Sequence, residues 1–166
     1  MNLNSIISKL GFSTSLAQDA TLLLVLVFIS FIFGMFIGRY RLLTVLINTY
    51  VSFAILSVIP PGFISDYSYE LIAFLTLVVG LTLLGKKIFE IHISGAGSGF
   101  LWRVFAMSFL EVTLLLSIIL SILPKKTALS YVSSSSLDYL ASPNARLIWM
   151  VAPLIFLFFI HKRLNR

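Results

Sequence analysis

Residues 20–38 read ATLLLVLVFISFIFGMFIG, nineteen positions without one ionisable side chain, and Arg39 and Arg41 follow almost directly. At about 1.5 Å of rise per residue, a helix of this length covers a bilayer's hydrocarbon core of roughly 30 Å. A water-soluble domain rarely has room to bury so long a segment on every face. The segment therefore predicts a membrane-spanning helix, which we expect over residues 16–38.

The composition is typical of an integral membrane protein. Of the 166 residues, 59% are hydrophobic and 11% are charged, whereas an ordinary soluble domain has about 25% charged residues. We expect one transmembrane domain over residues 1–166. The formal net charge of +6 would suggest nucleic acid in a soluble protein. Here the cations lie mainly beside apolar segments, so we expect membrane lipids as partners and no nucleic acid.

Further apolar segments predict an all-α, polytopic integral membrane protein with four to five transmembrane helices. Pro60-Pro61, Gly85 and Pro124 end three of them, and Ser142-Pro143 has the form of an N-cap followed by proline at the first helical position. The serine run 133–136 is interpreted as loop. After the first helix, we expect membrane helices over residues 42–59, 69–84, 100–123 and 143–161.

The two ends of the chain leave the number of crossings open. Residues 1–14 place apolar side chains at helical spacing and predict a helix lying in the membrane interface. The last apolar segment is short for a span and is interrupted by Pro153. If it lies on the surface, the chain crosses four times and its basic tail faces outside. We favour five crossings, which place that tail inside.

The distribution of the cations predicts the orientation. With five crossings and the N-terminus outside, the inner segments hold eight cations and the outer segments hold four, as the positive-inside rule requires. Arg39, Arg41, Lys86 and Lys87 belong to the inner set. They either orient the helices or also contact lipid phosphates, and simple orientation is the favoured interpretation.

Glu111 is the leading candidate for a functional residue. It lies eleven residues into the fourth segment, near mid-membrane, where an acid costs about 2.5–3.5 kcal/mol on insertion scales. It should therefore face protein or water, yet Arg103 lies too far along the same helix to pair with it. One hypothesis is a proton- or ion-sensing site. The favoured one is an acid that fixes helix packing, with partners among Asn48, Thr49, Ser52 and Thr76.

Other motifs are few. Gly34 and Gly38 form a G-x-x-x-G pair, which predicts close helix packing, either within the chain or in a dimer. The chain has no cysteine, and its two histidines are far apart. No nucleophile, base and oxyanion hole assemble in the sequence. We therefore predict no catalytic residue, no metal site and no cofactor.

The layout over residues 19–124 resembles the colicin V production protein (CvpA) family of bacterial inner-membrane proteins. The similarity lies in Asp19 before an apolar helix, in Gly38-Arg39 at its end, and in Lys86-Lys87 leading through Gly99 to Arg103 in a fourth helix. Glu111 departs from the family, which commonly has a glycine-containing pair there.

The resemblance implies a non-enzymatic inner-membrane accessory or scaffold protein linked to secretion or envelope processes. Its expected partners are further copies of itself or another membrane protein. The alternative is an oligomeric channel or transporter component in which Glu111 lines an aqueous path.

Overall fold

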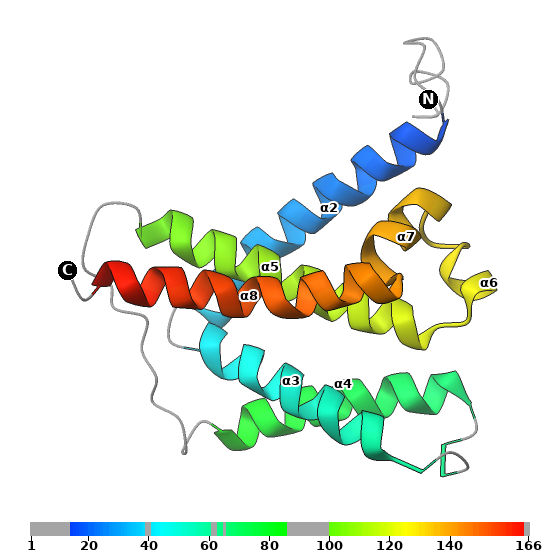
Figure 1. Cartoon of the computed structure of the whole chain (residues 1–166), viewed down its shortest axis with the longest axis horizontal. Coiled ribbons are helices and arrows are strands. Elements are labelled where there is room, and N and C mark those ends of the chain that lie inside the picture. The colour runs from blue at the N-terminus through cyan, green and yellow to red at the C-terminus, as the bar shows by residue number, and fades with distance from the viewer. Residues whose placement is uncertain (1–13, 39–40, 61–62, 65, 86–99, 165–166) are drawn as a thin grey trace.

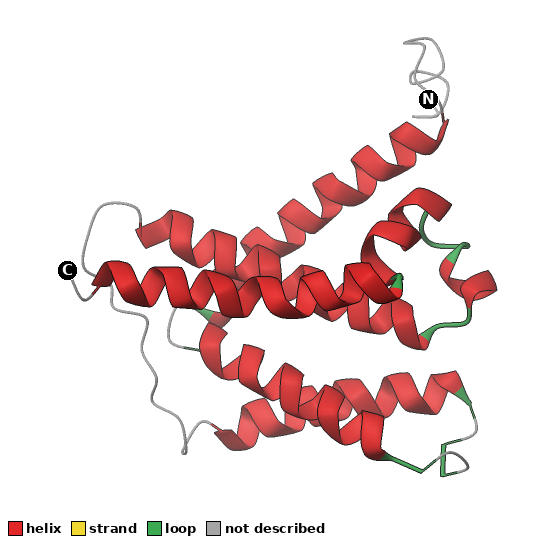
Figure 2. Cartoon of the chain, in the orientation of Figure 1, coloured by secondary structure: helices red, strands yellow, loops and turns green. Residues whose placement is uncertain are grey.

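The computed structural model describes residues 14–38, 41–60, 63–64, 66–85 and 100–164. These residues form seven helices and no strand (Figures 1 and 2), which confirms the predicted all-α class. The interfacial helix predicted for residues 1–14 lies almost wholly outside the described residues. The helices are α2 (Thr14–Ile37), α3 (Leu42–Val58), α4 (Tyr67–Leu84), α5 (Phe100–Ile122), α6 (Lys125–Ala128), α7 (Ser134–Ala141) and α8 (Pro143–Leu164).

The five long helices coincide with the five predicted segments, and side-chain caps explain where two of them begin. Asp66 accepts a hydrogen bond from the Ser68 backbone N–H at 3.4 Å, so α4 begins two residues before the predicted start. Ser142 accepts from the Ala145 N–H at 3.3 Å, which confirms the predicted cap before Pro143.

The serine run is not the loop that its composition predicts, and this prediction is wrong. Ser133 is the N-cap of α7 and accepts from the Ser136 N–H at 3.0 Å, so the other serines of the run form the first turn of that helix. Serine has low helix propensity but is a favoured cap. Leu137 and Leu140, three residues apart, then fix α7 by burying one face.

Three helices are long and apolar enough to span a membrane, namely Ala17–Ile37, Tyr67–Leu84 and Leu101–Ile122. A fourth span results if α7 and α8, which are bent by 54° at their junction, are taken as one broken span. The apolar helix α3 has 17 residues, or about 25 Å of length. A fifth crossing depends on this shorter helix, and it stays a prediction.

The arrangement of the helices follows the predicted alternation (Figure 1). The end of α2 and the starts of α3 and α5 lie at one end of the molecule with the end of α8, and the end of α3, the start of α4 and the α6–α7 segment lie at the other. The helices α3 and α4 form an antiparallel hairpin, and α5 packs against α2, α3, α4, α7 and α8. The central helix α5 therefore holds the bundle together.

The core gathers on one face of α5. Met107, Leu114 and Ile118 are fully buried and form one cluster with Phe74 of α4 and Leu46 of α3. Large apolar side chains elsewhere stay exposed, as expected for surfaces in contact with lipid tails. On α2, Leu26 and Ser30 are the buried side chains in the described part, while Leu24, Phe28 and Phe36 are exposed.

The two glycines of the G-x-x-x-G pair have different roles. A Cβ atom at Gly34 would lie 2.7 Å from Ser108 Oγ of α5, so α2 approaches α5 closely here. Gly38, predicted as a packing residue, has a φ of 66°, and a Cβ atom there would meet nothing within 4 Å. Gly38 instead ends α2, where its N–H bonds to the Gly34 carbonyl at 3.1 Å.

We predict that Gly34→Ile destabilises the protein by about 1–3 kcal/mol, because the new side chain overpacks the α2–α5 contact. Thermal unfolding of the purified protein in detergent measures this effect. Gly80→Ile is the matched control, since a Cβ atom at Gly80 meets open space. An equal loss of stability in the two variants would contradict the proposed close contact.

Candidate functional site: a buried acid and a docked short helix

Buried polar side chains are concentrated on α3 and α5, and most of them have partners. Thr49 donates to the Val45 carbonyl at 2.9 Å, and Thr113 donates to the Phe109 carbonyl at 2.7 Å. Ser108 bonds in the same way to the carbonyl of Val104, four residues earlier, at 2.8 Å. Such local bonds satisfy a hydroxyl inside an apolar environment without the need for a second helix.

Glu111 is the exception among these buried groups. It is 0% exposed, and neither carboxyl oxygen has a hydrogen-bond partner in the described part of the chain. The buried Ser52 Oγ of α3 is also without a partner there. An unpartnered polar group in a dry interior costs about 1–3 kcal/mol, and a charged group costs far more. Burial of this kind is tolerable only for the neutral acid.

The partners predicted for Glu111 from the sequence do not bond to it. Asn48 donates instead to Thr82 Oγ1 of α4 at 3.2 Å. Thr49 bonds within its own helix, and Thr76 is exposed on the outside of α4. Packing sets how each helix is rotated about its own axis, and this rotation decides which way each side chain points. Arg103, eight residues before Glu111, is half-buried near the start of α5.

Tyr50 of α3 was not singled out from the sequence. Its hydroxyl donates a hydrogen bond to the Met150 carbonyl of α8. The next carbonyl along the helix is that of Trp149. It would normally accept a hydrogen bond from the N–H of residue 153, but Pro153 has no N–H. Tyr50 therefore connects α3 to the part of α8 that the proline weakens.

This arrangement can hold a proton. The described residues contain no group of three or more His, Cys, Asp or Glu side chains suited to a metal. Because Glu111 is fully enclosed in the single chain, it lines no open aqueous path there. Proton exchange at this carboxyl requires the packing around α5 to open.

The second polar arrangement is the docking of α7, which sequence reasoning missed. Asp19 of α2 accepts hydrogen bonds from the hydroxyls of Ser133 and Ser136, at the N-terminus of α7. A carboxylate in this position also interacts favourably with the helix dipole. The available signal was the spacing of Ser133 and Ser136, which is typical of a helix N-cap ahead of Leu137.

The other end of α7 is held by two further helices. Ser117 of α5 donates to the Leu140 carbonyl at 2.5 Å, and Trp149 Nε1 of α8 donates to the Tyr139 carbonyl at 2.9 Å. The last carbonyls of a helix have no partner within it. Side chains from α5 and α8 supply the missing donors here, so three neighbouring helices fix this short helix.

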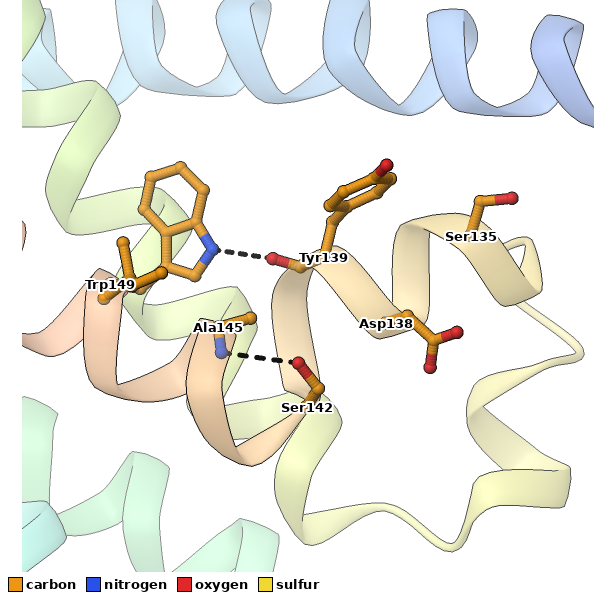
Figure 3. Close-up of a pocket in the computed structure, with 7 residues that line it drawn as sticks. Ser135, Asp138, Tyr139, Ser142, Ala145 and Trp149 are labelled. Carbon is orange, nitrogen blue, oxygen red and sulfur yellow. Dashed lines mark hydrogen bonds between the residues drawn. The ribbon is translucent and has the colours of Figure 1, made fainter.

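An open groove of about 590 Å³ lies between α7 and α8 (Figure 3). Trp149 and Tyr139 border it with their rings, and the Asp138 carboxylate leaves α7 in a different direction from the Tyr139 ring. The lining residues are Ser135, Asp138, Tyr139, Ser142, Ala145, Ile148 and Trp149.

The remaining candidate residues are cations at the predicted inner end. Arg41 is exposed directly before α3, where it can contact lipid phosphates or simply orient the helix. Arg39, Lys86 and Lys87 lie outside the described residues.

In comparisons with known proteins, no family model, no curated protein and no solved structure matches this chain. The resemblance to the colicin V production protein family stays a prediction from the sequence layout.

We predict that Glu111→Leu raises stability by about 1–3 kcal/mol, because it removes a buried acid that has no hydrogen-bond partner among the described residues. Thermal unfolding in detergent measures the change. Glu111→Gln keeps the shape and an unpartnered polar group, so it should change stability much less. A clear loss of stability in Glu111→Leu would show that the carboxyl has a structural partner.

We also predict that Asp19→Ala loosens α7, because both serine hydroxyls lose their acceptor. Hydrogen exchange of the backbone amides in residues 134–141 should become faster, while exchange in α5 stays unchanged. Asp66→Ala removes a carboxylate from another helix start and should leave residues 134–141 unaffected. Unchanged protection of α7 in Asp19→Ala would mean that Asp19 does not hold the helix.

Proposed function

We propose that this chain is a non-enzymatic accessory or scaffold protein of the bacterial inner membrane, acting in secretion or envelope processes through helix–helix contacts. The resemblance to the colicin V production protein family supports the location and the process. No enzymatic role is proposed, because the sequence offers no nucleophile–base motif.

The observation that carries the proposal is the exposure of α2. This helix diverges from α5 and α8 toward its N-terminus (Figure 1), and Leu24 and Phe28 are 67% and 62% exposed. Apart from its contacts with α5 and α7, it offers an apolar surface over most of its length. Lipid tails or a helix of another subunit can cover such a surface, which suits a protein that works by lateral association.

A second candidate function is an oligomeric channel or transporter component that uses Glu111. Its support is that Glu111 is a buried acid whose carboxyl makes no hydrogen bond to any of the described residues. Intramembrane acids of this kind mark proton and ion pathways in many transporters. Because Glu111 is enclosed in the single chain, this function requires association or a conformational change that admits water.

Extraction in a mild detergent, with the mass of the complex measured by light scattering and its proteins identified by peptide sequencing, tests the proposal. We expect a second membrane protein in a fixed ratio, whose identity names the process. A homo-oligomer with no other protein would instead favour the channel. In that case Glu111→Gln should abolish ion flux in vesicles, whereas Thr76→Val, which changes an exposed polar residue, should not.

A further inference from the structure

We propose that the groove between α7 and α8 binds the headgroup of a phospholipid that carries a primary ammonium group, such as phosphatidylethanolamine. This proposal concerns a different part of the molecule from Glu111 and is independent of the function proposed above.

The groove lies where lipid headgroups are expected. It is at the end of the bundle that holds the α6–α7 segment (Figure 1), beside the first turns of α8. The helix α7 buries Leu137 and Leu140 and exposes Asp138 and Tyr139, as a helix lying in the membrane interface does. Tyr139 is 76% exposed, and Trp and Tyr side chains are enriched at this depth.

The charge of the lining selects the chemical class of the ligand. The seven lining residues include one carboxylate and several hydroxyls but no Lys, Arg or His. Asp138 is exposed, so its oxygens are accessible to a ligand. The hydroxyl of Ser142 already accepts from the Ala145 N–H, and the Trp149 indole N–H is used by the Tyr139 carbonyl. The hydroxyls of the lining can both donate and accept, so its one charged group, the Asp138 carboxylate, decides the selection and suits a donor with positive charge rather than a bare phosphate.

The other lining atoms fit the remainder of such a lipid. Ala145, Ile148 and the Trp149 ring form an apolar wall on α8, along which the upper part of an acyl chain can lie. The hydrogen bond from Trp149 to α7 fixes its ring in place (Figure 3). Arg146 stands three residues before Trp149 on the same helix, at a spacing that puts both on neighbouring positions of the α8 surface. It can supply positive charge for the phosphate of the same lipid.

The contrast between ethanolamine and choline lipids isolates the proposed contact. Both headgroups have the same net charge and a phosphate, but only ethanolamine has N–H donors for the Asp138 carboxylate. An exposed charge-assisted contact is worth at most about 1 kcal/mol, or roughly a fivefold preference. Anionic phosphatidylglycerol lacks the ammonium group and should be disfavoured beside Asp138.

Quenching of Trp149 fluorescence by brominated lipids tests the proposal in the full chain. The chain has two tryptophans, so Trp102, which is exposed, is replaced by phenylalanine. The protein is reconstituted into vesicles of phosphatidylcholine that contain equal fractions of brominated phosphatidylethanolamine, phosphatidylcholine or phosphatidylglycerol. We expect the ethanolamine lipid to bind roughly threefold better than the other two. Equal quenching by the ethanolamine and choline lipids, or strongest quenching by the glycerol lipid, would overturn the proposal.

Asp138→Asn assigns the preference to one residue. It should reduce the ratio of ethanolamine to choline lipid binding to about one, because the amide has no negative charge. Asp66→Asn is the matched control, since it makes the same change at the same end of the bundle and asparagine keeps the N-cap of α4. A preference that survives Asp138→Asn would show that the carboxylate does not recognise the ammonium group. Circular dichroism confirms that both variants keep their helices.

Discussion

In the hydrocarbon of a membrane a polar group has no water to bond with, so each one must find its partner inside the protein. The rest of this structure depends on that constraint, and side chains of α3 and α5 supply the bonds between helices that meet it. Asn48 bonds across the α3–α4 hairpin to Thr82, Tyr50 joins α3 to α8, and Ser117 joins α5 to α7. The apolar core on α5 brings the helices together, and these bonds fix how they are rotated against one another.

Glu111 does not obey the same constraint. A carboxyl that stabilised packing would use at least one of its oxygens, as Asp19 does with two serine hydroxyls. Glu111 uses neither among the described residues, although leucine would fill a similar volume without the cost of burying an acid. Proteins retain costly groups of this kind where they serve function rather than stability. Among the described residues, none of the partners that the packing hypothesis names bonds to Glu111, and the packing and sensing hypotheses both stay predictions.

The long helices could be predicted from the sequence, because each is marked by an apolar run and by residues directly at its ends. An apolar run bounded by Pro60 or Pro124 has no other stable form in a membrane, and the cap at Ser142 is a short-range pattern. Prediction from the sequence failed for α7, an eight-residue helix that is rich in serine and is stabilised by three other helices rather than by its own composition. It also failed for the partners of Glu111. Which residues face one another depends on helix rotation, and a single sequence does not contain that information for segments that are apolar all round.

The bend between α7 and α8 depends on contacts that other helices make with α7. The groove exists because α7 is bent by 54° from the axis of α8. Asp19 holds one end of α7, and Ser117 and Trp149 hold the other. Two of these three contacts come from helices that do not line the groove. A shift of α2, a long helix with few buried side chains, would therefore move the N-terminus of α7 and change the shape of the groove. Coupling between sites is reciprocal, so a lipid that filled the groove would also favour one position of α2. The surface proposed for association and the site proposed for lipid are thus connected through one short helix.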